Sequence, residues 1–301
     1  MKQFFFAPGL RVAFAFLVAA AMAASAGRAA EIPEPATPPL WVVEKDGKKL
    51  YLFGSIHLLP PQTKWRRSEL EQAWAASQVF VFEAPLDDGG AEMMRFVEKG
   101  GRLHDGRTLK DVLPEALHAD LGRAAWSVEY PPKLLEPFRP WLAAVYLELY
   151  AYIKAGFSSY YGVDHVIEVD AKSRKAELAY FETIEDQLAY FALLDAKTET
   201  AYLKATVRSV LEEPDLPVQL VAAWGSGKTE VLTKLLEDGF KEVPLLRSQL
   251  LVARNRNWIP RIKSMLASDK THFVTVGVGH LVGKDSVVAM LRAKGYKVAG
   301  P

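Results

Sequence analysis

The chain has 301 residues, a formal net charge of +1 at pH 7 and no cysteine. A near-neutral chain lacks the basic surface that nucleic-acid binding requires, and a chain without cysteine forms no disulfide bond and carries no lipid on a cysteine. The length suffices for one large domain, and the even composition without low-complexity tracts favours a single compact unit.

The N-terminal segment has the composition of a secretory signal peptide. Lys2 and Arg11 precede an apolar run, and the small residues 24–26 offer a cleavage site. We therefore expect a signal peptide over residues 1–26 and a periplasmic or secreted protein. The apolar run is shorter than the roughly 20 residues that span a bilayer, so we expect no stable membrane insertion after cleavage. A retained N-terminal anchor is the alternative.

The first predicted elements after this segment are two strands. Residues 27–39 are rich in proline and predict an extended linker, which precedes one α/β domain over residues 40–301. The stretch "LWVVEKDGKKLYLFGSIH" predicts two strands joined by a turn at Asp46-Gly47. A helix pattern follows and leads to an apolar strand over 79–82, which ends at Glu83. This order is typical of a parallel βαβ unit.

The middle of the chain predicts a helical insertion over about residues 90–175. Prolines interrupt the helical pattern at several points where helices start or stop. The stretch "PWLAAVYLELYAYIKAG" is its most apolar helix, but Glu148 and Lys154 interrupt and close it. We expect a core or lid helix there rather than a membrane contact.

The C-terminal part of the sequence predicts two more strands of the same sheet. One is short and ends at Glu182, and the other leads through a Gly-rich turn to His280. The predicted fold class is α/β, with a central mixed, largely parallel sheet flanked by helices. The helical insertion is expected to lie over the carboxyl edge of the strands.

A Gly-x-x-His motif follows a strand at each end of the domain. "GSIH" ends at His57 and "GVGH" ends at His280, while Glu83 and Glu182 follow two other strands. Ligands gather at the carboxyl ends of parallel strands, so these four side chains are expected to face one site. Imidazoles and carboxylates suit Zn²⁺, Mn²⁺, Co²⁺ or Fe²⁺, which would polarise a carbonyl and lower the pKa of bound water.

The stretch "RNRNW" adds a candidate arginine. Arg254 is expected to pair with Glu83 or Glu182, or to bind a substrate carboxylate. The alternative is a solvated basic helix face. "AAWGSGKT" is not read as a phosphate-binding loop, because Ala222 stands where that motif needs its first glycine.

Together these segments resemble the TraB/GumN family, which includes TIKI-type proteases. The resemblance rests on "PLWVVEKDGKKLYLFGSIHLLP", "VFVFEAP", "YGVDHVIEVDAK", "YFETIEDQL", "AAWGSGK", "RNRNW", "FVTVGVGHLVG" and "LRAKGYKV". It implies an α/β fold related to the haem-binding ChaN and erythromycin-esterase proteins. It also implies hydrolysis of peptide or protein substrates, since TIKI-type members are described as Mn²⁺- or Co²⁺-dependent peptidases that act on protein N-termini.

The resemblance also implies roles for individual residues. His57, Glu83 and His280 become the expected metal ligands, for Mn²⁺, Co²⁺ or Zn²⁺. Glu83, Glu182 and Arg254 become the expected catalytic residues, with Glu182 as general base or additional ligand. Asp164 and Asn255 are expected to hold the site together.

The expected function is therefore an exported metal-dependent hydrolase, a peptidase in particular. The alternatives are a non-catalytic protein that binds haem or a metal, and an accessory protein linked to surface polysaccharide. Oligomeric state stays open.

Overall fold

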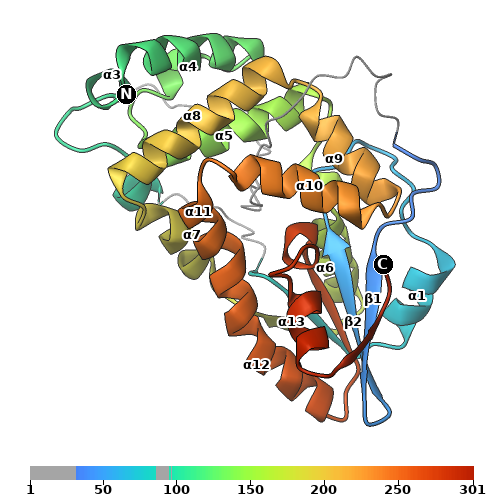
Figure 1. Cartoon of the computed structure of the whole chain (residues 1–301). Helices are drawn as coiled ribbons and strands as arrows, with labels where there is room; N and C mark the ends of the chain where they lie inside the picture. The colour runs from blue at the N-terminus through green and yellow to red at the C-terminus, as the bar shows by residue number, and fades with distance from the viewer. Residues whose placement is uncertain (1–31, 86–94, 96) are drawn as a thin grey trace.

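The structure is a computed structural model that describes residues 32–85, 95 and 97–301 (Figure 1). The expected signal peptide, residues 1–26, and the first part of the expected linker lie outside the described residues. Residues 86–94 and 96, around the expected start of the helical insertion, also lie outside them. Figure 1 shows a layer of helices above a sheet, with the arrowhead of strand β2 pointing toward helix α10.

One mixed sheet forms the centre of the fold. Its strands lie in the order β4-β3-β5-β2-β1-β6. Strands β2, β5, β3 and β4 run parallel, whereas β1 is antiparallel to both β2 and β6. This confirms the predicted mixed, largely parallel sheet. The strands are β1 (Leu40–Lys45), β2 (Lys48–Ser55), β3 (Val79–Phe82), β4 (Glu177–Tyr180), β5 (His272–Gly277) and β6 (Lys297–Ala299).

The predicted turn between the first two strands is present. Asp46 and Gly47 both have positive φ, of 50° and 77°. A two-residue hairpin loop of this kind matches the right-handed twist of its strands, and Asp-Gly adopts it readily. The hairpin sets the register of β1 against β2, with Lys45 opposite Lys48.

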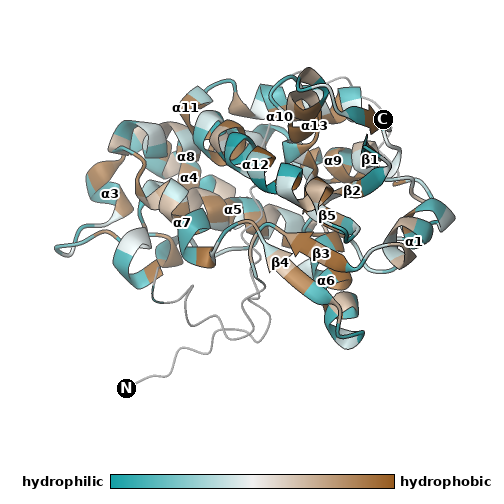
Figure 2. Ribbon diagram, turned by 90° about the horizontal axis from the view of Figure 1, so that it is seen from below, coloured by the Kyte–Doolittle hydropathy of each residue, from teal (hydrophilic) through white to brown (hydrophobic). Residues whose placement is uncertain are grey.

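Helices cover both faces of the sheet. Successive side chains of a strand point to opposite faces, and here the side chains on both faces are apolar. Leu52, Val81 and Val274 belong to a core cluster with α12 and α13, whereas Phe53 and Phe80 pack in another with α1 and α6. Figure 2 shows β3 coloured as strongly apolar, as a strand buried on both faces requires. These helices are α1 (Ser68–Ala75), α6 (Val163–Ser173), α12 (Arg254–Ala267) and α13 (Val287–Ala293).

A separate helical layer lies beyond the carboxyl ends of the strands. Its core is built around Trp141, Phe191 and Leu203, from helices α5, α7 and α8. The layer extends past the predicted limit of residue 175, because the amphipathic helices after Glu182 join it. Its elements are η1 (Val97–Gly101), α3 (Leu109–Val112), α4 (Glu115–Ser127), η2 (Pro132–Leu134), α5 (Pro140–Lys154), η3 (Ser159–Tyr161), α7 (Ile184–Ala192), α8 (Ala196–Glu212), α9 (Leu216–Gly225) and α10 (Thr229–Phe240).

The helical segment that leads to Arg254 is divided into three parts. It consists of α11 (Pro244–Arg247), a π-helical turn η4 (Ser248–Ala253) and α12. Single π-helical turns occur frequently at functional sites, and this one ends directly before Arg254. The last short element, η5 (Val278–His280), follows β5.

The described part of the expected linker, residues 32–39, is packed against the domain. The Ala36 side chain is fully buried, and the Thr37 N–H donates to the Gly225 carbonyl at the end of α9. The apolar helix α5 is likewise a core helix, with Trp141 and Leu142 fully buried. Within the described residues no helix has the length and apolar character to span a membrane.

Candidate active site

The sheet register brings the predicted site residues to one edge. Strand β5 lies between β2 and β3, with Gly277 paired to Ser55 and Thr275 paired to Phe82. Beyond the end of β3, the Glu182 N–H donates to the Glu83 carbonyl over 2.8 Å. His57, Glu83, Glu182 and His280 therefore all follow strand ends at the same carboxyl edge, as predicted.

Gly277 marks the point where three of these side chains converge. A Cβ built on Gly277 would lie 3.2 Å from Glu83 Oε1, 3.3 Å from His57 Nε2 and 3.8 Å from His280 Cδ2. The two Gly-x-x-His motifs thus face the same small space, and a glycine is needed there because any side chain would fill it.

The backbone around His57 is held by close contacts with helix α6. The Val163 N–H donates to the Ile56 carbonyl over 2.9 Å. A Cβ on Gly162 would overlap the His57 carbonyl, so a glycine at the start of α6 permits this approach. The first turn of α6 then places Asp164 Oδ1 2.9 Å from His57 Nδ1.

This contact determines how His57 faces the site. Because a carboxylate lies beside Nδ1, the proton of the neutral ring belongs on that nitrogen and the Nε2 lone pair faces Glu83 and Gly277. Burial lowers the pKa of His57, but the Asp164 and Glu83 carboxylates outweigh it and raise that pKa above its ordinary value. His57 is therefore the basic group of the site.

Glu83 is held at both carboxylate oxygens. Its Oε1 accepts from the Gly277 N–H over 2.7 Å, and its Oε2 accepts from Arg254 Nη2 over 2.6 Å and from Gln187 Nε2 over 3.3 Å. Burial disfavours its charge, yet the Arg254 guanidinium and the two nearby imidazoles hold the pKa of Glu83 far below its usual range. Glu83 is therefore ionised.

Arg254 links the two glutamates and is itself 0% exposed. Its Nε donates to both oxygens of Glu182 over 3.0 Å, and Nη2 lies 2.8 Å from Glu182 Oε2. Trp258 Nε1 also donates to Glu182, over 3.0 Å. The predicted pairing of Arg254 is thus formed with both glutamates, and the alternative of a solvated helix face is wrong because α12 turns this residue into the sheet edge.

His280 is held in one protonation state by its neighbours. Asn255 donates from Nδ2 to the Asp285 carbonyl, so its Oδ1 faces His280 Nδ1 at 2.6 Å. His280 Nδ1–H therefore donates to Asn255, and His280 Nε2 accepts from Arg254 Nη1 over 3.1 Å. Burial lowers the pKa of His280 to about 3, so the ring is neutral.

The space between these groups is a cavity of about 60 Å³, lined by His57, Glu83, Gly277 and His280 among others. It has room for roughly two water molecules. The donor set suits a divalent ion, and a carboxylate on the far nitrogen, as Asp164 is for His57, is the usual support of a metal-bound histidine.

The three expected ligands do not form a complete coordination group in this structure. Among the described residues no group of three or more His, Asp or Glu side chains is arranged to hold a metal ion. The reason is Arg254, which contacts both Glu83 and His280 Nε2. Arg254 therefore engages the facing atoms of two of the three expected ligands.

Some site residues were not predicted from the sequence. Gln187 reaches Glu83 from α7, whose start is set by a capping box of Thr183 and Asp186. That box follows Glu182 directly and could have indicated a helix over the site. Trp258 reaches Glu182 from the same helix as Arg254. His104, His118, His165 and His272 do not line the cavity.

The fold and the cluster together define an α/β protein with a His/Glu/Arg site at the carboxyl edge of its sheet. A sequence profile of the TraB/PrgY/gumN family matches residues 39–299. The chain belongs to this family.

The chain also resembles two animal proteins. Metalloprotease TIKI1 of Homo sapiens is 24% identical over 320 aligned positions, which cover 86% of this chain and 61% of the relative. Metalloprotease TIKI1 of Danio rerio is 24% identical as well, over 86% of this chain and 62% of the relative. The chain thus spans less than two thirds of the length of these curated relatives. No solved structure matches it.

Proposed function

We propose that this protein is a metal-dependent peptidase that acts after export. The observation that carries the proposal is the convergence of His57, Glu83 and His280 on Gly277 in a cavity of about 60 Å³. The name of the distant relatives, metalloprotease, supports the same reaction class. Export rests on residues 1–26 alone.

His57 is the proposed main ligand for a metal ion. Its Nδ1 lies beside Asp164 and its Nε2 lone pair faces the cavity. Asp164 keeps the imidazole oriented and increases its basicity, as a carboxylate does for a metal-bound histidine.

Arg254 is proposed to stabilise the negative charge that develops on the carbonyl oxygen through the field of its own charge rather than by a direct hydrogen bond, because Glu83, Glu182, His280 and the Leu250 carbonyl engage its N–H groups. It is fixed by Glu182 and Trp258, so it needs no reorganisation when that charge forms. Glu182 has both oxygens in contact with Arg254, and we propose that it positions the guanidinium rather than transferring protons.

A divalent ion, Mn²⁺, Co²⁺ or Zn²⁺, is the proposed cofactor, held by His57 and Glu83 with His280 adjacent. Such an ion supplies a water of lowered pKa and polarises the carbonyl when it is bound. Haem binding by these histidines is disfavoured, because both nitrogens of His280 are engaged and the cavity holds only small molecules.

The test is metal removal and reloading. Mature protein stripped with a chelator and reloaded with Mn²⁺ or Co²⁺ should gain about 2.7 kcal/mol of stability at a metal concentration 100 times the Kd. It should also cleave a mixture of internally quenched fluorescent peptides of random sequence. His57→Ala should lose both effects, while His118→Ala, outside the cavity, should keep them. No metal-dependent thermal shift together with no cleavage would refute the proposal.

A further inference from the structure

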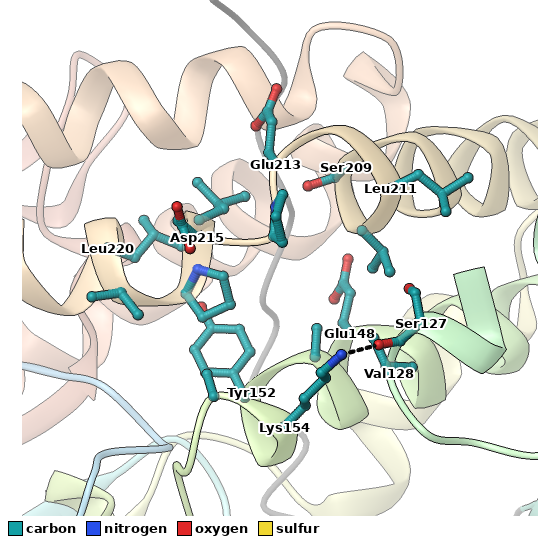
Figure 3. Close-up of a pocket in the computed structure, with 17 residues that line it drawn as sticks. Ser127, Val128, Glu148, Tyr152, Lys154, Ser209, Leu211, Glu213, Asp215 and Leu220 are labelled. Carbon is teal, nitrogen blue, oxygen red and sulfur yellow. Dashed lines mark hydrogen bonds between the residues drawn. The ribbon is translucent and has the colours of Figure 1, made fainter. Parts of the chain in front are cut away.

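A second, larger cavity lies in the helical layer. It has a volume of about 500 Å³ and is formed by α4, α5, α8, α9 and the loop between α8 and α9 (Figure 3). This volume is within the range of about 300–1,000 Å³ that is usual for ligand sites. Much of its wall is apolar, including Val128, Val210, Leu211 and Val218. We call it the helical groove.

The helical groove adjoins the candidate active site. Tyr152 and Leu220 line both the groove and the cavity of about 60 Å³ that contains His57. A cavity that holds roughly two waters is too small for a peptide, so a polypeptide substrate needs an adjoining site. The groove is adjacent through these two shared residues.

The Tyr152 hydroxyl at this junction has no hydrogen-bond partner among the described residues. The residue is only 4% exposed, and its ring packs edge-on against Phe157 at 5.6 Å. A buried hydroxyl without a partner costs stability. In Figure 3 the Tyr152 side chain points from α5 toward the loop of Asp215 and α9. The Tyr152 hydroxyl is therefore available to donate a hydrogen bond to a ligand.

Glu148, another buried polar residue of the groove, is committed to the fold. Glu148 accepts hydrogen bonds from the hydroxyls of Tyr202 and Thr206, each over 3.2 Å. Burial and the nearby Glu148 carboxylate raise the pKa of Tyr152 well above its ordinary value. Tyr152 therefore keeps its proton and can act as a hydrogen-bond donor.

We propose that the helical groove binds an apolar segment of a polypeptide substrate, and that the Tyr152 hydroxyl donates a hydrogen bond to a backbone carbonyl of that segment. Apolar walls with a free donor suit a peptide whose side chains fill the groove and whose carbonyl meets the donor. That the segment belongs to a substrate, and that it leads to the cavity at His57, rests on the proposed function.

The inference is tested by binding to metal-free mature protein, which needs no catalysis. The probe is acetyl-Leu-Ala-Leu-amide, measured by isothermal titration calorimetry. Tyr152→Phe removes only the hydroxyl and should raise the Kd roughly fivefold, as expected for one neutral hydrogen bond. The same variant should unfold at an equal or higher urea concentration, because it removes a buried hydroxyl that has no partner. A structural hydroxyl would give the opposite stability change.

Two further variants complete the test. Ala151→Trp places a large side chain on the groove wall and should abolish binding of the probe. Tyr296→Phe removes a hydroxyl from a tyrosine that packs near Lys45, outside both cavities, and should leave the Kd unchanged. The inference is overturned if the wild type does not bind the probe, if Tyr152→Phe binds it equally well, or if Ala151→Trp still binds it.

These outcomes are independent of the proposed function. Probe binding that depends on Tyr152, in a protein that shows no cleavage after metal reloading, would support the groove and count against the peptidase. Cleavage with no dependence of probe binding on Tyr152 would support the peptidase and overturn the groove.

Discussion

Glu83 Oε2 lies 2.6 Å from Arg254 Nη2, although 171 positions separate the two residues in the chain. Arg254 is 0% exposed and Glu83 is 9% exposed, so both charges are largely removed from water. The same guanidinium contacts Glu182 and His280. One buried cation therefore holds two carboxylates and one neutral imidazole in place at the sheet edge.

Arg254→Met should strongly destabilise the protein. The substitution leaves two buried carboxylates without their cation, and breaking a buried ion pair in this way costs about 3–5 kcal/mol. Urea denaturation at pH 7 measures the change in the free energy of unfolding. Arg256→Met, on the exposed side of the same helix, is the matched control and should change it by less than about 0.5 kcal/mol. Equal effects of the two variants would contradict the central role of Arg254.

His280 should make the protein less stable as the pH falls from 6.5. The pKa of His280 is about 3 in the folded protein, whereas a histidine in an unfolded chain has a pKa of 6.5. Between these pH values the unfolded chain binds a proton that the folded protein does not. Its contribution to stability is complete above pH 6.5 and decreases by up to about 1.4 kcal/mol per pH unit below it.

His280→Gln keeps polar groups near Asn255 and Arg254 but does not titrate. The free energy of unfolding of the wild type should therefore fall more steeply than that of the variant between pH 6.5 and 5, where carboxylates contribute little. The pKa of His272 is also lowered by burial, but this residue is present in both proteins and contributes equally. Parallel pH profiles would mean that His280 is not held neutral.

Local features of the fold were predictable because neighbouring residues determine them. Backbone preferences and the periodicity of apolar residues predict the Asp46-Gly47 turn, the apolar strand before Glu83 and the helix starts at prolines. The convergence of the two Gly-x-x-His motifs followed from a general rule about parallel sheets.

The pairing inside the site was not predictable to the same degree. Whether Arg254 faces solvent or the sheet depends on the rotation of α12, which the π-helical turn before it alters and which no local pattern announces. The contact of Gln187 with Glu83 depends on where α7 docks. Both are long-range packing results, so sequence spacing alone leaves them open.

Asp164→Asn should lower the pKa of His57. The Asp164 carboxylate is the largest influence that raises this pKa against burial, and an amide carries no charge. The measurement is an NMR titration of the histidine ring signals in metal-free protein. His272, at the start of β5 and away from Asp164, serves as an internal control and should titrate at the same pH in both proteins. If the His57 signal titrates at the same pH in both proteins, Asp164 does not tune it.

Gly277→Ala should impair the site with little effect on the fold. The added methyl would lie 3.2 Å from Glu83 Oε1 and 3.3 Å from His57 Nε2, while the backbone φ of −49° is compatible with alanine. We expect peptide cleavage to fall on the order of 100-fold, because small displacements of reacting groups have effects of this size. In Gly279→Ala the added methyl would lie 3.5 Å from Leu236 and 3.8 Å from Leu251, which are ordinary contacts, so this variant should retain activity. Equal activity of the two variants would place the reacting groups away from Gly277.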